Sequence, residues 1–150
     1  MNNEKESRFP DPLICAFYGK DKSGNDSKIL LRDFTWRDPI LGDIIVPSGF
    51  IYDGASIPSI AWTSLGLHPF SSEVDKAGLL HDYLYATKKL PREECDKVLR
   101  RILRYENELS AVTISIIYGA VRLAGESSYE ETQDESEYFR PDEVKQFIRN

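Results

Sequence analysis

Short β-prone runs separated by turn-forming residues occupy the first third of the chain. These runs cover residues 13–18, 28–36, 43–46 and 50–52. Glycine, proline, aspartate and asparagine cluster between them, most densely at residues 19–27. Runs of this length and composition predict a small, mostly antiparallel β-sheet whose first two strands form a hairpin with a long exposed loop.

From residue 72 onward the apolar residues recur every three or four positions, which is the period of an amphipathic helix. We expect helices over 72–87, 91–106 and 109–123, after a short helix at 58–62. The first is expected to bury one stripe: Val74, Ala77, Gly78, His81, Leu84 and Tyr85. The third is apolar nearly all round and is expected at the centre of the helical core. The fold class is then α+β: a small antiparallel β-sheet followed by a three-helix core, in a single domain.

Polar segments flank this domain, which we expect to span residues 11–125. Residues 1–10 are typical of a flexible arm. Residues 126–138 carry six acidic side chains and no basic ones, which predicts a mobile or surface-wrapping acidic segment at the start of a tail over 126–150. A last short helix at 140–148 is expected to dock through Val144, Phe147 and Ile148.

Charge and composition exclude several functional classes. The net charge is −6 with basic residues scattered among acidic ones, so no nucleic acid is expected as a partner. The longest uncharged apolar stretch, 109–121, is too short for a membrane span, and the polar N-terminus does not resemble a signal peptide. Cys15 and Cys95 lack the spacing of a zinc or redox motif, which favours a reducing, cytoplasmic compartment.

One apolar helical run places His81 and Asp82 side by side at its centre, and this is the strongest candidate for chemistry. A short loop at 88–90 makes the helices before and after it antiparallel neighbours. His81 lies seven residues before residue 88 and Asp96 eight after it, so we expect the two side chains to meet. A carboxylate would orient the imidazole as a general base for water. Asp82 points about 100° away and could offer oxygen to a divalent cation such as calcium.

The loop at residues 52–58 has two interpretations. Asp53, Gly54 and Ser56 before Pro58 are compatible with a loop that cradles a ligand or offers carbonyl groups to a metal. They are also compatible with an ordinary turn that precedes a helix, which is the more common use of such residues. His68 stands before a proline with no second histidine at metal-ligand spacing, so it is expected to be a loop residue. No G-x-S-x-G or H-E-x-x-H motif is present, so the sequence does not favour serine-hydrolase or zinc-protease chemistry of the kinds that these motifs mark.

Three segments together resemble a family of unknown function found mainly in phages, prophages and bacteria. They are residues 46–58 (VPSGFIYDGASIP), 76–85 (KAGLLHDYLY) and 117–125 (IYGAVRLAG), with Asp96 between the last two. The resemblance covers about residues 43–125. It implies an accessory protein in a phage or other mobile element, located in the host cytoplasm or the virion, with no known cofactor.

The His-Asp helix is also similar, more weakly, to that of the small calcium-dependent phospholipases. In that resemblance His81 corresponds to their water-activating base and Asp82 to their calcium ligand. Tyr85 corresponds to their helix tyrosine and Asp96 to their orienting carboxylate. Their paired cysteines are missing here, and Asp53 to Ser56 are only a loose counterpart of their calcium loop.

Two hypotheses follow for the function. In the first, the chain is a metal-assisted hydrolase of an ester, lipid or small-molecule bond, with His81 and Asp96 as catalytic residues, Tyr85, Asp53 and Ser56 in support, and Asp82 as metal ligand. In the second, the same polar residues are a structural network, and the chain acts by binding a phage or host protein. Solvent access to His81 separates the two hypotheses.

Overall fold

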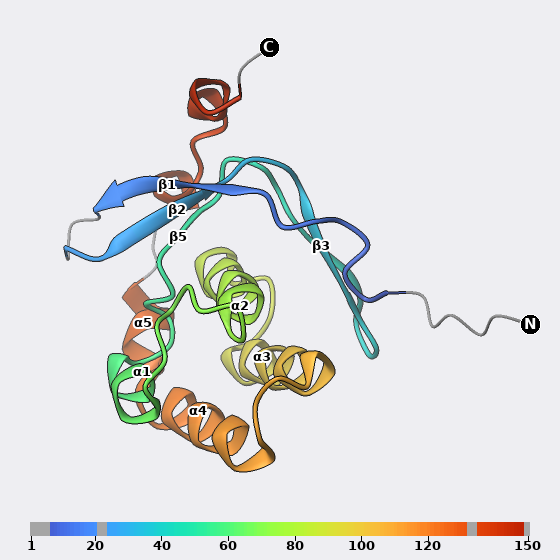
Figure 1. Ribbon diagram of the computed structural model, residues 1–150, viewed down its shortest axis with the longest axis vertical. Coiled ribbons are helices and arrows are strands. Elements are labelled where there is room, and N and C mark those ends of the chain that lie inside the picture. The colour runs from blue at the N-terminus through green and yellow to red at the C-terminus, as the bar shows by residue number, and fades with distance from the viewer. Residues whose placement is uncertain (1–6, 21–23, 132–134, 149–150) are drawn as a thin grey trace, which may run out of the picture.

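The computed structural model describes residues 7–20, 24–131 and 135–148, and it contains two small antiparallel sheets (Figure 1). Strands β1 (Cys15–Lys20), β2 (Asp26–Leu30) and β5 (Ile51–Tyr52) form a three-stranded sheet in the order β1-β2-β5. Strands β3 (Phe34–Asp38) and β4 (Gly42–Val46) form a separate hairpin. The predicted hairpin of the first two strands is present, with Cys15 opposite Leu30. Its loop includes residues 21–23, which lie outside the described residues.

The prediction of one strand over residues 28–36 is wrong, because the chain bends after Leu30. Leu31 still donates its backbone N–H to the carbonyl of Ile14, at the end of the first sheet. Two residues later, the Asp33 carboxylate accepts the backbone N–H of Ser48 at 2.8 Å, which ties the bend to the segment after β4. The two halves of the run therefore pair with different partners, β2 with β1 and β5, and β3 with β4.

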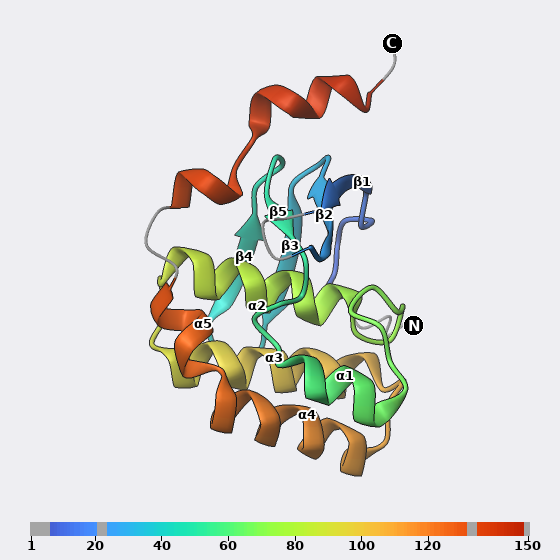
Figure 2. The same cartoon turned by 90° about the vertical axis from the view of Figure 1, so that its left-hand side faces the viewer.

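Helices follow the strands, so the α+β class is confirmed. They are α1 (Ser59–Leu65), α2 (Asp75–Thr87), α3 (Arg92–Glu106), α4 (Ala111–Ala124) and α5 (Glu126–Glu131), with two 3₁₀ turns, η1 (Glu135–Tyr138) and η2 (Pro141–Gln146). The sheets, α2, α3 and α4 succeed one another across the molecule, and α1 lies beside α4 (Figures 1 and 2). No helix in the described ranges is long and apolar enough to cross a bilayer.

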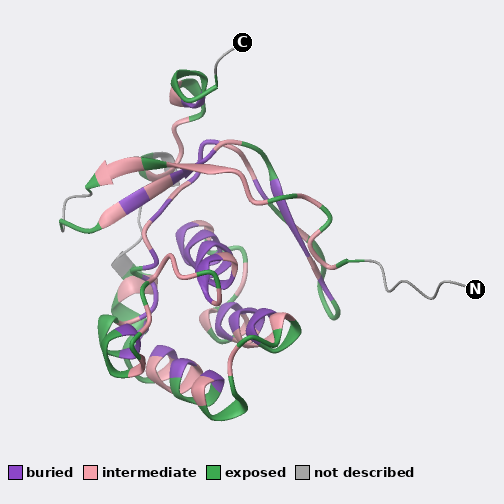
Figure 3. Ribbon diagram, viewed as in Figure 1, coloured by how far each residue is buried: buried purple, intermediate pink, exposed green. Residues whose placement is uncertain are grey.

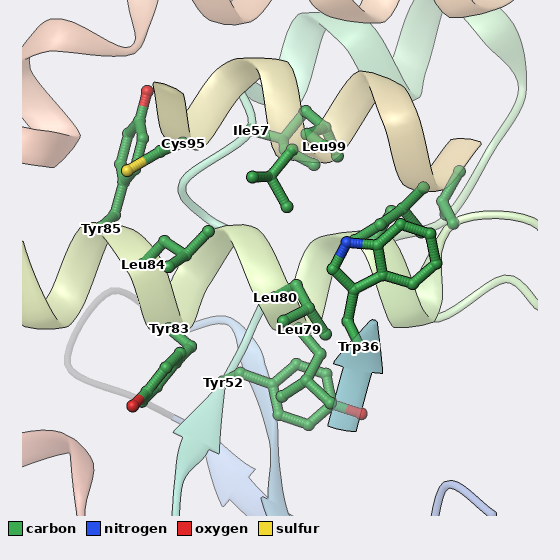
Figure 4. Close-up of a cluster of buried hydrophobic side chains, with 14 of the residues drawn as sticks. Trp36, Tyr52, Ile57, Leu79, Leu80, Tyr83, Leu84, Tyr85, Cys95 and Leu99 are labelled. Carbon is green, nitrogen blue, oxygen red and sulfur yellow. The ribbon is translucent and has the colours of Figure 1, made fainter. Parts of the chain in front are cut away.

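Helix α2 is the centre of the fold, and every residue from Ala77 to Ala86 is buried. The predicted single stripe was therefore too narrow, since the sheets cover one side of α2 and α3 covers another (Figure 3). The shared core includes Leu79, Leu80 and Leu84 of α2 and Leu99 of α3, with Trp36 of β3 at one end (Figure 4). A polar side chain on α2 must consequently find its partners inside the protein.

Helix α4 was predicted at the centre of the helical core, and this prediction is wrong. It lies in the outermost layer, on the side opposite the sheets (Figure 1). Only Ile114, Ile117 and Val121 are buried, on the side that faces α3. The error arises because the outer side of α4 is as apolar as its inner side, so the sequence alone does not distinguish an inner helix from an outer one.

Both ends of the described chain pack against the domain. Phe9 stacks on Phe34 at 5.3 Å between ring centroids, although residues 1–6 of the predicted arm lie outside the description. At the other end, the Arg140 backbone N–H donates to the carbonyl of Gly49. Gly49 has a φ of +91°, and a Cβ there would lie 2.7 Å from Pro141, so only glycine permits this approach.

The acidic segment follows the surface in its described parts, α5 and η1, while residues 132–134 lie outside them. The Tyr129 hydroxyl of α5 donates to the carbonyl of Leu90 at 3.1 Å. The predicted last helix is the 3₁₀ turn η2, in which Val144 is buried. Phe147 and Ile148, expected to dock with it, are instead 37% and 47% exposed, because the tighter turn does not carry them onto the same face.

Glu106 at the end of α3 provides a pH-dependent test of the fold. Its buried Oε1 has no hydrogen-bond partner within the described chain, and burial raises its pKa to about 7. Because the folded protein holds the Glu106 proton more tightly than the unfolded chain does, protonation of Glu106 favours folding. This contribution is fully present below the unfolded pKa of about 4.3 and is lost as the pH rises through about 7. Glu106→Gln cannot ionise, so its free energy of unfolding should rise relative to that of the wild type as the pH increases from about 5 to about 8. We expect a relative gain of only about 1 kcal/mol, because water near this partly buried group screens the effect.

Urea unfolding at both pH values measures this gain. Glu130→Gln, at an exposed position on α5, is the control and should change stability equally at both. A Glu106→Gln difference that does not vary with pH would contradict the assignment.

Candidate functional site

His81 and Asp96 meet across the hairpin formed by α2 and α3. Lys88 ends α2 in the left-handed conformation, with a φ of 52°, and α3 starts four residues later. His81 Nε2 lies 2.7 Å from Asp96 Oδ1, and both side chains are fully buried. The contact predicted from the spacing of these residues is therefore present.

Asp96 is held by further donors from three helices. The Tyr85 hydroxyl donates to Oδ1 at 2.6 Å, and the Arg122 guanidinium donates to Oδ2 at 2.7 Å. Arg92 lies 3.6 Å from Oδ2. Burial alone would raise the pKa of Asp96, but the hydrogen bonds from His81, Tyr85 and Arg122 outweigh it and hold the pKa below its usual range. Asp96 is thus an ionised carboxylate in the core.

Arg122 is a site residue that the sequence interpretation missed. It is the only charged residue of α4, and its guanidinium reaches Asp96 while its side chain stays 32% exposed. A lone arginine in an otherwise apolar helix is a signal for a buried carboxylate partner. Arg92 caps the same helix from outside by donating to the carbonyls of Val121 and Arg122.

Ser56 contacts the other ring nitrogen of His81. Its Oγ lies 2.8 Å from His81 Nδ1, and the same hydroxyl also contacts Asp82 Oδ1. Gly54 shapes the loop that delivers Ser56: its φ is +77°, and a Cβ there would lie 2.8 Å from Pro69. Ser56 was predicted as a supporting residue, but no local motif marked its direct contact with the histidine.

The Asp82 carboxylate holds the loop at residues 53–56 by accepting backbone N–H groups of that loop. Oδ2 accepts the N–H groups of Asp53 at 3.1 Å and Gly54 at 2.7 Å, while Oδ1 accepts the N–H of Ser56 at 3.3 Å. Burial raises the pKa of Asp82, against the opposing effect of the hydrogen bonds from Ser56 and Gly54. Asp53 turns its own side chain back on the loop and accepts the N–H of Ala55 at 2.7 Å.

These contacts do not fit a calcium ion at Asp82. Calcium takes six to eight oxygen ligands, many of them carbonyl groups, whereas this loop turns N–H groups toward both carboxylate oxygens. No cluster of three or more potential ligating side chains occurs in the part of the chain that the structure describes. Of the two interpretations of the 52–58 loop, the geometry fits a turn held by a carboxylate.

A cleft of about 610 Å³ opens beside this network, within the range of small-molecule sites. Ser56, Asp82, Tyr85 and Asp53 lie on its wall, and His81 does not. The remaining lining comes from β1, β2, the residues around β5, the end of α2, and the C-terminal segment. It comprises aromatic rings, hydroxyl groups, charges and small aliphatic groups: Tyr18, Lys20, Ser27, Phe50, Ile51, Tyr52, Ala55, Ala86, Ser128, Glu137, Tyr138 and Arg140. His81 thus lies behind two residues of the cleft wall, Ser56, which faces its Nδ1, and Tyr85, whose ring lies 4.1 Å away between centroids.

The arrangement forms a hydrogen-bonded chain from the cleft to the core. The Asp96 carboxylate is an acceptor, so His81 Nε2 donates to it, and the other ring nitrogen, Nδ1, faces the Ser56 hydroxyl. Ser56 has one proton and its hydroxyl donates to Asp82 Oδ1, so the hydroxyl must turn from Asp82 toward His81 Nδ1 before the histidine can accept that proton. The chemistry available is that of a serine hydroxyl next to a base with an orienting carboxylate.

Comparison with known proteins places the chain in a family without assigning an activity. Residues 29–121 match the family described as "Protein of unknown function (DUF1353)". The uncharacterized protein y4jT of Sinorhizobium fredii is 42% identical over 59 residues, which cover 39% of this chain and 17% of that relative. No solved structure matches. The family match covers more than half of the chain and confirms the expected family of unknown function, so the protein belongs to the DUF1353 family.

Proposed function

We propose that the protein is an ester hydrolase in which Ser56 is the nucleophile, His81 its base and Asp96 the orienting carboxylate. One observation carries the proposal: Ser56 Oγ, on the cleft wall, lies 2.8 Å from one ring nitrogen of His81 while the other lies 2.7 Å from Asp96. Nucleophilic sites share this logic of a hydroxyl, a base and a third group that orients the base.

The first step would transfer the Ser56 proton to His81 Nδ1 as Oγ attacks the ester carbonyl carbon. The alcohol leaves with that proton, and an acyl group remains on Ser56. Water then attacks the acyl carbon, passes a proton through His81 back to Ser56, and releases the acid. Ser56 stands between His81 and the cleft, so it replaces the His-activated water of the initial hypothesis as the group that attacks first.

A second candidate is a binding protein in which the network is purely structural. It is favoured by the full burial of His81 and by the loop amides, all of which are bonded within the protein. The N–H groups of residues 53–57 donate to Asp82, Asp53 or Gly54. None of these five amides is left to stabilise an oxyanion. In this candidate the cleft receives part of a phage or host protein, in the accessory role that the motif resemblance implies.

A fluorophosphonate probe separates the two candidates, because it reacts covalently with an activated serine. We expect mass spectrometry to find the adduct on Ser56 of the wild-type protein and to find none in Ser56→Ala. Ser128→Ala, which removes another hydroxyl from the same cleft wall, is the matched control and should retain the label. No adduct on Ser56 in a folded wild-type protein would reject the hydrolase and leave the binding protein.

A further inference from the structure

Helix α4 carries two apolar stripes on opposite sides, and only one of them is covered. The inner stripe, Ile114, Ile117 and Val121, is buried. The outer residues Val112, Ile116 and Leu123 are 70%, 45% and 90% exposed. At 100° per residue these three lie within about 40° of one another around the helix. Figure 3 shows exposed positions on the outward side of α4.

The fully exposed positions of α1 and α4 carry no charged side chain. Helix α1 packs beside α4 and exposes Ile60 at 68%. The exposed residues of the two helices are all uncharged: Ser59, Ile60, Thr63, Ser64, Ala111, Val112, Ser115, Ile116, Leu123 and Ala124. The single charged residue of both helices, Arg122, donates to the buried Asp96. In a chain with 29% charged residues, such a surface is typical of one that is covered by a partner.

We propose that the outer face of α4 binds the same face of a second copy of this chain. A chain with a net charge of −6 repels its own copies, and this uncharged face lets them approach without opposing like charges directly. A two-fold dimer needs one self-complementary patch, which a single apolar helix stripe provides. The helix would then be buried on both sides, as expected for a helix that is apolar all round.

An antiparallel crossing of the two α4 helices fits the order of residues along the stripe. Crossing near Ile116 and Gly119 sets Val112 of one copy against Leu123 of the other. Gly119 has open space where a Cβ would lie, so two helices can approach closely there. None of the cleft residues belongs to α1 or α4, so this dimer leaves the cleft accessible and does not depend on the proposed hydrolysis.

Sedimentation equilibrium of the full chain from about 1 to 200 μM tests the dimer, since weak apolar interfaces have dissociation constants in this range. We expect dimer to form with increasing concentration. Ile116→Glu and Leu123→Glu should each weaken association about tenfold or more. Ile40→Glu is the matched control: it adds the same charge at a 72% exposed isoleucine between β3 and β4, and it should dimerise like the wild type. Thermal melts of all variants verify folding.

Three results would overturn the proposal. The first is a wild-type chain that stays monomeric up to the highest concentration. The second is a dimer that Ile116→Glu and Ile40→Glu weaken equally. The third is a monomer that binds phosphatidylcholine vesicles through Ile116 and Leu123, which would assign the face to a lipid surface.

Discussion

Ser56→Ala is expected to lower the turnover of ester substrates by about 10³-fold or more, because it removes the nucleophile while the rest of the site stays in place. His81→Gln should lower turnover by a similar factor. The double variant should be no slower than either single variant, since the two residues act in one step. Initial rates with p-nitrophenyl esters of increasing acyl length measure all three and show which acyl groups the cleft accepts.

Stability measurements keep this result interpretable. Ser56→Ala removes one hydroxyl from a loop that Asp82 still holds by three backbone amides, so its melting temperature should fall by only a few degrees. The control Ser128→Ala should retain full turnover. A Ser56→Ala protein that hydrolyses esters as fast as the wild type would show that any activity comes from elsewhere, and the structural network would then be the better account.

The position of Ser56 also differs from the phospholipase-like arrangement expected from the His-Asp motif. The contacts of Asp96 with His81 and Tyr85 match what that resemblance implies. The other ring nitrogen of His81, which would face a water there, contacts Ser56 instead. Asp82, which corresponds to the calcium ligand of those enzymes, here accepts N–H groups of the loop. Of the arrangement that this resemblance implies, the contact between His81 and Asp96 is present, whereas the contacts of His81 Nδ1 and of Asp82 differ from it.

The helix pair was predictable because its determinants are local. A three-and-four periodicity sets which side of a helix is buried, and the short loop at Lys88 sets the phase between two neighbours. These two facts bring His81 and Asp96 together without knowledge of the remaining chain. The same periodicity predicted α3 to within one residue of its observed start, Arg92.

The rest of the site depends on contacts between distant segments. Ser56 meets His81 only because three backbone amides of its loop bind a carboxylate 26 or more residues further on. The split of the run at 28–36 follows from pairing partners on both sides of it, and no property of Arg32 or Asp33 alone requires it. For α4, an apolar sequence has the same pattern whether a helix lies inside one chain or between two.

Asp96→Asn is expected to lower the free energy of unfolding by about 3–5 kcal/mol, whichever function is correct. Asn retains an oxygen for His81 and Tyr85, but its amide N–H₂ would then face Arg122 and Arg92, leaving a partly buried guanidinium without its counter-charge. Urea unfolding at pH 7 measures the loss. Glu93→Gln, on the same helix, is the control: Glu93 pairs with Lys97 at the surface, so this change should cost less than about 1 kcal/mol.

The cost of Asp96→Asn should also depend on pH in a defined direction. The pKa of Asp96 is lowered in the folded protein, so its stabilisation is present above the unfolded pKa of about 3.9 and is lost as the pH falls through the folded value. The difference between wild type and variant should therefore be constant near neutral pH and shrink in acid below about pH 4. A difference that stays constant into acid would mean that Asp96 is not held ionised by its neighbours, and the buried base would then lack the carboxylate that orients it.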